Sequence, residues 1–127
     1  MTGVKRLIAL RGAAMCENSA QDIKKQTVEM YDELLRANKL GEEDIVSVFF
    51  SVTGDIDAKN PATALREEGR AENSSLFVNQ EAAFAGSPSG VIRVLIHCYL
   101  DAGGKPFHVY INGAEILRPD RAANQDG

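Results

Sequence analysis

The chain has 127 residues, of which 44% are hydrophobic and 25% are charged, and its formal net charge is −4 at pH 7. These values are ordinary for one soluble globular domain and leave no need for a second one. Because no basic block or Lys/Arg stripe stands out, nucleic acid and anionic membrane surfaces are excluded as expected partners. An anionic ligand would therefore have to be held by arginines gathered locally, against an unfavourable overall field.

Neither a metal site nor a targeting segment is indicated. The two cysteines, Cys16 and Cys98, are far apart in the sequence, and no CxxC motif or Cys/His cluster accompanies them. Two reduced thiols are therefore a better interpretation than a zinc site or a disulfide. The N-terminal segment alternates apolar with charged residues and lacks a small-residue cleavage site, and no stretch approaches the ~18 apolar residues of a membrane span. We expect a cytoplasmic protein.

The first half of the chain predicts a strand, a long helix and a second strand. Residues 4–11 have the pattern of a strand that stops at a glycine. Asn18 or Ser19 can cap a helix that runs to about Leu40 with an apolar stripe along one side. Residues 45–52, IVSVFFSV, are nearly all apolar or small, which is typical of a strand buried on both faces.

The second half predicts a short helix and two further strands. Asn60 followed by Pro61 is typical of a helix N-cap and first turn, and the helix is expected over residues 61–68. A brief strand is expected over residues 76–79. Residues 91–100, VIRVLIHCYL, form the most strand-like segment of the chain.

The last predicted element is a β-hairpin. Asn112-Gly113 is a strong type I′ turn signal, so the flanking residues 107–111 and 114–117 are expected to pair as its two strands. A tail over residues 121–127 is expected to be disordered. Together these elements predict a single α+β domain over residues 1–120, with a mixed sheet of five or six strands and the helices on one face.

Arg93 is the residue that fits an ordinary strand least. It interrupts an apolar run, and by the period-two rule it shares a strand face with mostly apolar or aromatic residues, namely Val91, Leu95, His97 and Tyr99. An arginine that points into water from an edge strand is the default interpretation. On a face of this composition, however, it must extend its charge to water, pair with a carboxylate or face an anion.

Four other residues carry weaker signals. Arg11 closes the first strand, a place that often carries function in α/β architectures. Arg66 lies on the short helix, where a solvated face is the ordinary interpretation, and Glu81 taken alone is a loop carboxylate. Tyr110 is expected to pack in the core or at an interface. No nucleophile motif surrounds either histidine, so no catalytic triad is predicted.

Six segments, in matching order and spacing, carry a resemblance to a known family. The sequence resembles the bacterial monofunctional chorismate mutases of the trimeric pseudo-α/β-barrel type over nearly its whole length. No single segment is specific, but six in register are a strong signal. The segments are LRGA at residues 10–13, SVTGDI at 51–56, PATALRE at 61–67, QE at 80–81, VIRVL at 91–95, and VY at 109–110 leading to LRPD at 117–120.

The resemblance implies a fold, a reaction and an assembly. The sheet would trimerise into a pseudo-α/β-barrel, giving a homotrimer with its sites at the subunit interfaces. The activity would be that of an isomerase, chorismate mutase, which rearranges chorismate to prephenate by a pericyclic (Claisen) step in aromatic amino-acid biosynthesis. The family reaction needs no cofactor and no metal, so none is expected here.

The resemblance also implies roles for individual residues. Arg93 would face the breaking ether oxygen, Glu81 would contact the ring hydroxyl, and Arg11 would hold a substrate carboxylate. These three are the expected catalytic residues. The expected substrate-binding residues are Arg66, Tyr110, Val78, Thr63, Leu117 and Arg118.

The sequence departs from the family pattern at three positions. Asn60 stands where the family often has an aromatic residue, Thr63 replaces a frequent lysine, and Val78 replaces a small or thiol-bearing residue. The first two changes remove an apolar lid element and a cation at the mouth of the site. We therefore expect them to affect substrate affinity more than the chemistry.

Two other function classes are compatible with the same architecture. The Rid-type imine deaminases resemble this protein in length, trimeric assembly and overall fold, but they bind a carboxylate with one key arginine. They do not explain the ordered set of arginines, Glu81 and the LRPD ending. The third hypothesis is a non-catalytic trimer that binds a carboxylate metabolite, for which the departures at Asn60 and Thr63 leave room.

Overall fold

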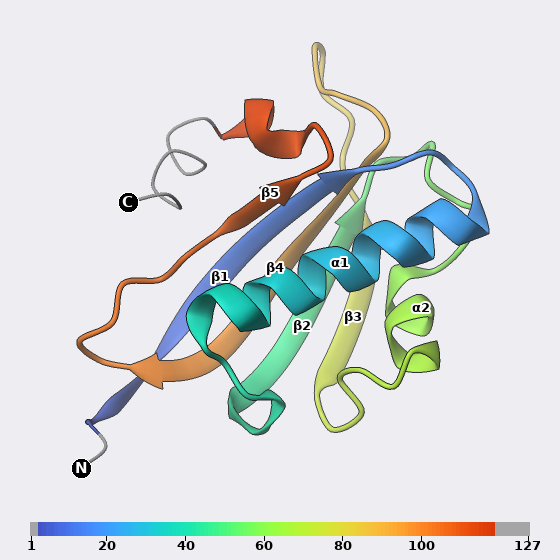
Figure 1. Cartoon of the computed structure of the whole chain (residues 1–127). Helices are drawn as coiled ribbons and strands as arrows, with labels where there is room; N and C mark the ends of the chain where they lie inside the picture. Colours follow the sequence, from blue (N-terminus) through green and yellow to red (C-terminus); the bar gives the residue numbers. More distant parts are fainter. Residues whose placement is uncertain (1–2, 119–127) are drawn as a thin grey trace.

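The fold is a mixed five-stranded sheet with two α-helices, seen in a computed structural model that describes residues 3–118 (Figure 1). The strands are β1 (Lys5–Met15), β2 (Ile45–Val52), β3 (Ser75–Gln80), β4 (Val91–Asp101) and β5 (Val109–Ile111). The α-helices are α1 (Ala20–Asn38) and α2 (Pro61–Glu67), and two 3₁₀ turns are η1 (Glu42–Asp44) and η2 (Ala114–Leu117). This confirms the predicted α+β class and mixed sheet.

The long strand β4 lies in the middle of the sheet, whose order is β3-β2-β4-β1-β5. It pairs antiparallel with β1 on one side and with β2 on the other. The outer strands β3 and β5 run parallel to their neighbours β2 and β1. Because β1 and β2 are both antiparallel to β4, they run in the same direction, and α1 connects them.

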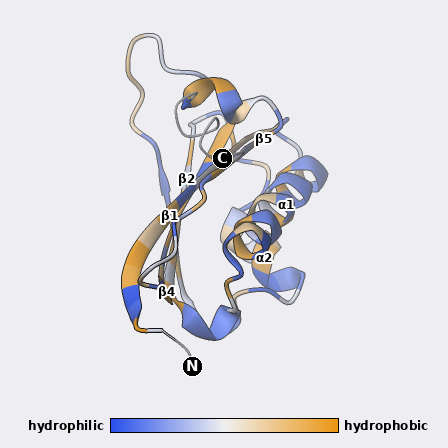
Figure 2. Ribbon diagram, turned by 60° about the vertical axis from the view of Figure 1, so that its left-hand side comes forward, coloured by the Kyte–Doolittle hydropathy of each residue, from blue (hydrophilic) through white to orange (hydrophobic). Residues whose placement is uncertain are grey.

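Both helices pack against the same face of the sheet, as predicted (Figure 2). The core lies between these layers, and its largest side chains have no exposed surface or almost none, such as Leu10 of β1, Phe50 of β2, Ile96 of β4, and Met30 and Leu34 of α1. The other face, called the open face below, has neither α-helix over it, and of residues 3–118 only η2 packs on it, beside Ala13 and Tyr110. The same five strands therefore contribute to the core on one face of the sheet and to an accessible surface on the other.

Local capping residues begin both helices where the sequence places them. The Ser19 hydroxyl accepts a hydrogen bond of 3.1 Å from the backbone N–H of Asp22 at the start of α1. The Asn60 side chain accepts from the backbone N–H groups of Ala62 and Thr63 at the start of α2. Each cap satisfies donors that the first helical turn leaves without an intrahelical partner.

The predicted hairpin is wrong in its second arm. Asn112 and Gly113 have φ angles of 52° and 94°, the left-handed values that a type I′ turn requires. The chain then coils into η2 instead of returning as a strand. The reason is packing, since Ala114 and Leu117 contact a small cluster that contains Ala13 and Tyr110.

The prediction that Ile45–Val52 is buried on both faces is wrong for the single chain. Val48 and Phe50 are 0% and 1% exposed beneath the helices, whereas Phe49 on the other face is 41% exposed. The two helices cover one face of β2, and residues 3–118 provide nothing to cover the other. The open face thus carries apolar side chains that are not buried.

Other expectations are adjusted by small amounts or lie outside the described residues. β1 continues past Gly12 to Met15, because Gly12 pairs with Val94 and Val109 on its two sides. No helix among residues 3–118 is long and apolar enough to cross a membrane. The expected domain end at residue 120 and the expected disordered tail over 121–127 lie outside the described residues.

Gly12 permits the close approach of α1 to the sheet, and this contact can be tested. A Cβ at this position would lie 2.9 Å from Val94 Cγ1, 3.1 Å from Leu34 Cδ1 and 3.2 Å from Met30 Cγ. We expect Gly12→Ala to lower the free energy of unfolding by about 1–3 kcal/mol through overpacking. Gly103→Ala is the matched control, because a Cβ there meets nothing within 4 Å. Equal urea midpoints for the two variants would contradict this account.

Candidate active site

A pocket of about 360 Å³ opens on the open face of the sheet. Its wall combines cationic, polar and aromatic side chains from all five strands with Arg118 after η2. It is lined by Arg11, Gly12, Phe49, Phe50, Ser51, Asn79, Arg93, Val94, Leu95, Tyr110 and Arg118. The sheet therefore brings together arginines from three separate parts of the chain.

The register of the sheet explains why these residues meet. One row of paired residues crosses all five strands in the order Asn79, Ser51, Arg93, Ala13 and Tyr110. Paired residues of neighbouring strands point to the same face. An amide, a hydroxyl, a guanidinium and a phenol are thus aligned across the sheet, with the small Ala13 between the last two.

Arg93 forms an ion pair with Glu81 at the centre of this row. Its Nε donates to Glu81 Oε1 at 2.8 Å, and the Ser51 hydroxyl lies 3.5 Å from the same oxygen. The side chains of Arg93 and Glu81 are 36% and 21% exposed, so the pair adds little net stability and chiefly fixes orientation. Glu81 is itself anchored, because its backbone N–H donates to the carbonyl of Val52 at 2.7 Å.

Arg11 and Tyr110 occupy the β1–β5 side of the pocket. The Arg11 side chain is exposed, and its backbone N–H donates to His108 Nδ1 at 3.0 Å. Tyr110 is 5% exposed and packs with Ala13 and Ala114, and Leu117 contacts the same cluster. The predicted residues Arg11, Arg93, Tyr110 and Arg118 thus line one pocket, with Glu81 joined to it through Arg93 and Leu117 packed behind it.

Three predicted site residues lie away from this pocket within the chain. Thr63 and Arg66 are on α2, which packs against the opposite face of the sheet. Val78 alternates with the open-face residues Phe77 and Asn79 along β3, and it packs against the core. One chain does not bring these three side chains to Arg11 and Arg93.

The pocket also contains residues that the sequence analysis did not assign to the site. Ser51, Asn79, Phe49 and Leu95 line it. Leu95 is two residues from Arg93, so the period-two rule already placed it on the same face. The other three become visible only once the strand order and register are known.

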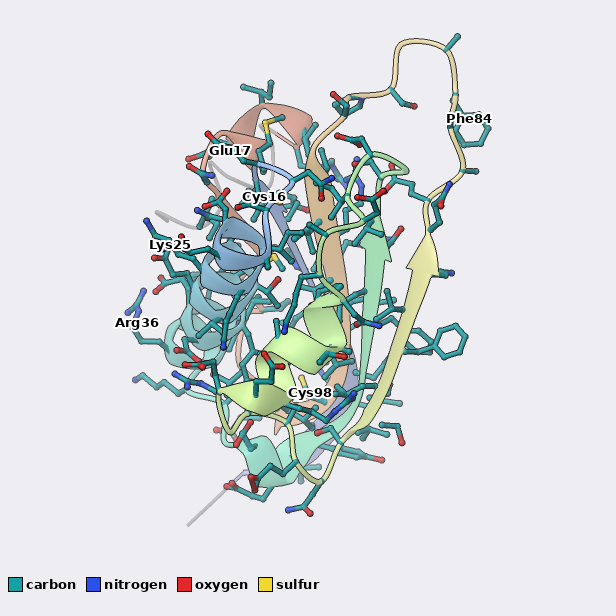
Figure 3. The ribbon with its side chains drawn as sticks, turned by 90° about the vertical axis from the view of Figure 1, so that its right-hand side faces the viewer. Cys16, Glu17, Lys25, Arg36, Phe84 and Cys98 are labelled. Atoms are coloured by element: carbon teal, nitrogen blue, oxygen red, sulfur yellow. The ribbon has the colours of Figure 1, made fainter. Side chains whose placement is uncertain are left out.

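The thiols and the possible metal ligands give no further chemistry within the described part of the chain. Cys16 and Cys98 are free and lie well apart (Figure 3). Burial raises the pKa of each thiol to about 11, which keeps both protonated at neutral pH. Residues 3–118 contain no group of three or more histidine, cysteine, aspartate or glutamate side chains that could hold a metal ion.

An α+β domain with arginines gathered in a pocket on an uncovered sheet face is suited to bind, or to act on, a small multiply charged anion. Comparison with known proteins identifies the family. The model of the family described as chorismate mutase type I matches residues 7–121. The chain belongs to this family, whose members named as chorismate mutases are isomerases.

Individual relatives agree with this assignment. The chain is 29% identical over 113 residues to chorismate mutase AroH of Bacillus subtilis (strain 168), covering 87% of this chain and 89% of the relative. It is 34% identical over 119 residues to chorismate mutase AroH of Thermus thermophilus, covering 91% and 97% of the two chains. The solved structure of a chorismate mutase from Clostridium thermocellum is similar with a TM-score of 0.79 and 36% identity, covering 87% of this chain and 99% of that one.

The raised thiol pKa values lead to a prediction about reactivity. A pKa near 11 lowers the thiolate fraction near neutral pH by about a hundredfold relative to an ordinary cysteine, and the rate should rise with pH as the thiolate forms. We expect iodoacetamide to label Cys16 of the folded protein far more slowly than it labels glutathione, as followed by mass spectrometry. Labelling of Cys16 at the glutathione rate near neutral pH would show that the raised pKa is wrong.

Proposed function

We propose that the arginine-lined pocket is the active site of a chorismate mutase that converts chorismate to prephenate in the cytoplasm, as a step of aromatic amino-acid biosynthesis. The family match over residues 7–121 supports the activity. The observation that carries the assignment of the site is the ion pair between Arg93 and Glu81 at 2.8 Å, held at the centre of the open face.

The reaction makes two demands on a protein, and the first is to hold a flexible substrate. Chorismate is a dianion that must fold its enolpyruvyl arm over its ring before the pericyclic step can occur. Fixing two carboxylates in that geometry lowers the barrier through proximity and orientation. Arg11 and Arg118, which line the pocket, present planar guanidinium groups that can bind carboxylates with two hydrogen bonds.

The second demand is electrostatic. As the carbon–oxygen bond breaks, the ether oxygen gains negative charge while the ring becomes relatively positive. A fixed cation that faces this oxygen stabilises the transition state more than the bound substrate. Arg93 has the required fixed position, since it lies on the central strand and is oriented by Glu81. The Glu81 carboxylate is then placed to contact the ring hydroxyl.

The reaction needs no proton transfer, no covalent intermediate and no metal ion. We therefore propose that the protein works without a cofactor. The test of the activity is the loss of the chorismate ultraviolet absorbance with purified protein and no additives, with prephenate identified as the product. Retained absorbance, or a requirement for an added metal or cofactor, would contradict the proposal and favour an imine deaminase or a non-catalytic carboxylate binder.

Oligomerisation is the second part of the proposal. The open face exposes large apolar side chains, with Leu7 55%, Phe49 41%, Phe77 58% and Tyr99 44% exposed. Such a set of exposed apolar residues is characteristic of an interface. A homotrimer would cover this face and would allow a neighbouring copy to supply Arg66, Thr63 and Val78 to the pocket. This explains why these three residues lie away from Arg93 of their own chain.

The departures at α2 are expected to weaken substrate binding without altering the chemistry. Asn60 is used as the N-cap of α2, with hydrogen bonds to two backbone N–H groups, and so it is committed to the local fold. Lys59 cannot readily replace the missing cation of position 63, because its ammonium pairs with Glu67 at 2.7 Å. The neighbouring copy would thus present Arg66 as the main cation of α2.

Replacement of Arg93 by citrulline tests the electrostatic role. Citrulline keeps the shape and most of the hydrogen-bonding capacity of arginine but removes its charge. We expect kcat to fall by at least on the order of 10²–10³ with little change in KM, because the lost interaction is made mainly in the transition state. Arg66→Ala is the comparison variant and should chiefly raise KM. Near-normal kcat for the citrulline variant, with loss of kcat for the Arg66 variant, would reverse these roles.

Mixing two inactive variants tests whether each site is shared between copies. Arg66→Ala and Arg93→Ala proteins should each be nearly inactive at low substrate concentration. After they are unfolded and refolded together, a site built from Arg93 of one copy and Arg66 of the next is intact in about a quarter of cases. We expect activity to return to that level, with a trimeric mass by light scattering. No recovery, or a fully active monomer, would contradict the shared site.

A further inference from the structure

The short edge strand β5 is joined to β1 by few backbone contacts. The parallel pairing has three register positions, from Gly12 with Val109 to Ala14 with Ile111. On its other side β1 pairs with β4 over its whole length. β1 is therefore paired on both sides, whereas β5, which carries Tyr110, has backbone pairing on one side only and is otherwise held by the packing of its side chains.

The chain that enters β5 turns toward α1 just before the pairing begins. The carboxamide of Asn38, the last residue of α1, binds both backbone groups of Phe107. Its Nδ2 donates to the Phe107 carbonyl at 2.9 Å, and its Oδ1 accepts from the Phe107 N–H at 2.8 Å. The Phe107 backbone is thus directed to the helix and does not extend the ladder toward Arg11.

The imidazole of His108 takes the place of the backbone acceptor at this position. The backbone N–H of Arg11 donates to His108 Nδ1 at 3.0 Å, one residue before the first paired position of the ladder. A backbone N–H is always a donor, so Nδ1 must be the acceptor, and in the neutral ring the proton lies on Nε2. The hydrogen bond thus specifies one tautomer of the ring.

The His108 contact lies beside two residues of the β1–β5 side of the pocket, Arg11 and Tyr110. Arg11 and Tyr110 both line the pocket. The backbone N–H of Arg11 binds His108, and Tyr110 is paired with Ala13. Arg11 precedes Ala13, which pairs with Tyr110, and Tyr110 follows His108. The His108 contact and the Ala13–Tyr110 pair therefore set the separation of the guanidinium and the phenol.

We propose that His108 is a positioning residue, which holds β5 against β1 through Nδ1 and thereby sets the spacing of Arg11 and Tyr110 as a pair of carboxylate-binding groups. The proposal rests on the proposed function of the pocket, because it assigns both groups to the same substrate. The role is to organise binding and not to stabilise the transition state. Loss of the His108 side chain should therefore raise KM and leave kcat largely unchanged.

Two conservative variants separate the hydrogen bond from the bulk of the ring. In His108→Asn the amide oxygen can occupy the place of Nδ1, whereas in His108→Gln the amide lies one carbon further out, near the place of Nε2. We expect His108→Ala and His108→Gln to raise KM about fivefold, the value of one net hydrogen bond, with kcat nearly unchanged. His108→Asn should keep a KM close to that of the original protein. Equal KM values for the Asn and Gln variants, or an effect confined to kcat, would overturn the proposal.

A measurement that does not depend on activity tests the contact itself. In ¹⁵N-labelled protein, a scalar coupling between the Arg11 amide nitrogen and His108 Nδ1 across the hydrogen bond should be observed by NMR. It should persist even if the protein proves to have no mutase activity, so failure of the proposed function and failure of this inference are distinguishable. Absence of the coupling in the original protein would overturn the inference, including in the case where His108→Ala does not fold.

Discussion

The ion pair between Arg93 and Glu81 is the interaction on which the rest of the site depends. Arg93 lies on the central strand, where a charge without a partner would be costly if the open face were covered. Glu81 resolves this cost and fixes the direction of the guanidinium. The segment that links Glu81 to Arg93 is also held close to Arg93, at Gly90. The Gly90 N–H donates to the Asp55 carboxylate at 2.9 Å, and the Gly90 carbonyl accepts from the Cys16 N–H. Phe84 in this segment projects into solvent (Figure 3), but the two charged residues at the ends of the segment are held in place.

The site and the core are two faces of the same strands. On β4, Ile92 and Val94 point to the helices and are nearly fully buried, while Arg93 and Leu95 between and beside them line the pocket. A shift of register by one residue would place the guanidinium in the core. The packing that stabilises the fold therefore also enforces the chemistry of the open face. Because the two α-helices occupy only one face, the other can hold the proposed site and the proposed interface between copies.

Features that depend on neighbours in sequence could be predicted, and those that depend on the arrangement of the sheet could not. The caps at Ser19 and Asn60 are local, and both predictions are confirmed. The face that carries Arg93 followed from alternation alone. The row that brings Ser51 and Asn79 beside Arg93 requires the strand order, to which these residues give no local signal. The prediction of the hairpin was wrong for a related reason. Turn residues specify φ angles, but they do not specify whether the segment after the turn pairs with another strand.

The sheet holds the groups of the proposed site in two different ways. Arg93 has a paired strand on each side, so its charge is held in place before any substrate arrives, as electrostatic stabilisation of a transition state requires. Tyr110 lies on a three-residue edge strand, and Arg118 follows a single 3₁₀ turn beyond it. A group at such an edge has backbone pairing on one side at most, so its position depends on side-chain packing and side-chain hydrogen bonds. In the proposed function, the division between chemistry at the centre of the sheet and binding at its edge would thus follow from strand order. It would also account for the hydrogen bonds by which His108 and Asn38 hold the segment that enters β5.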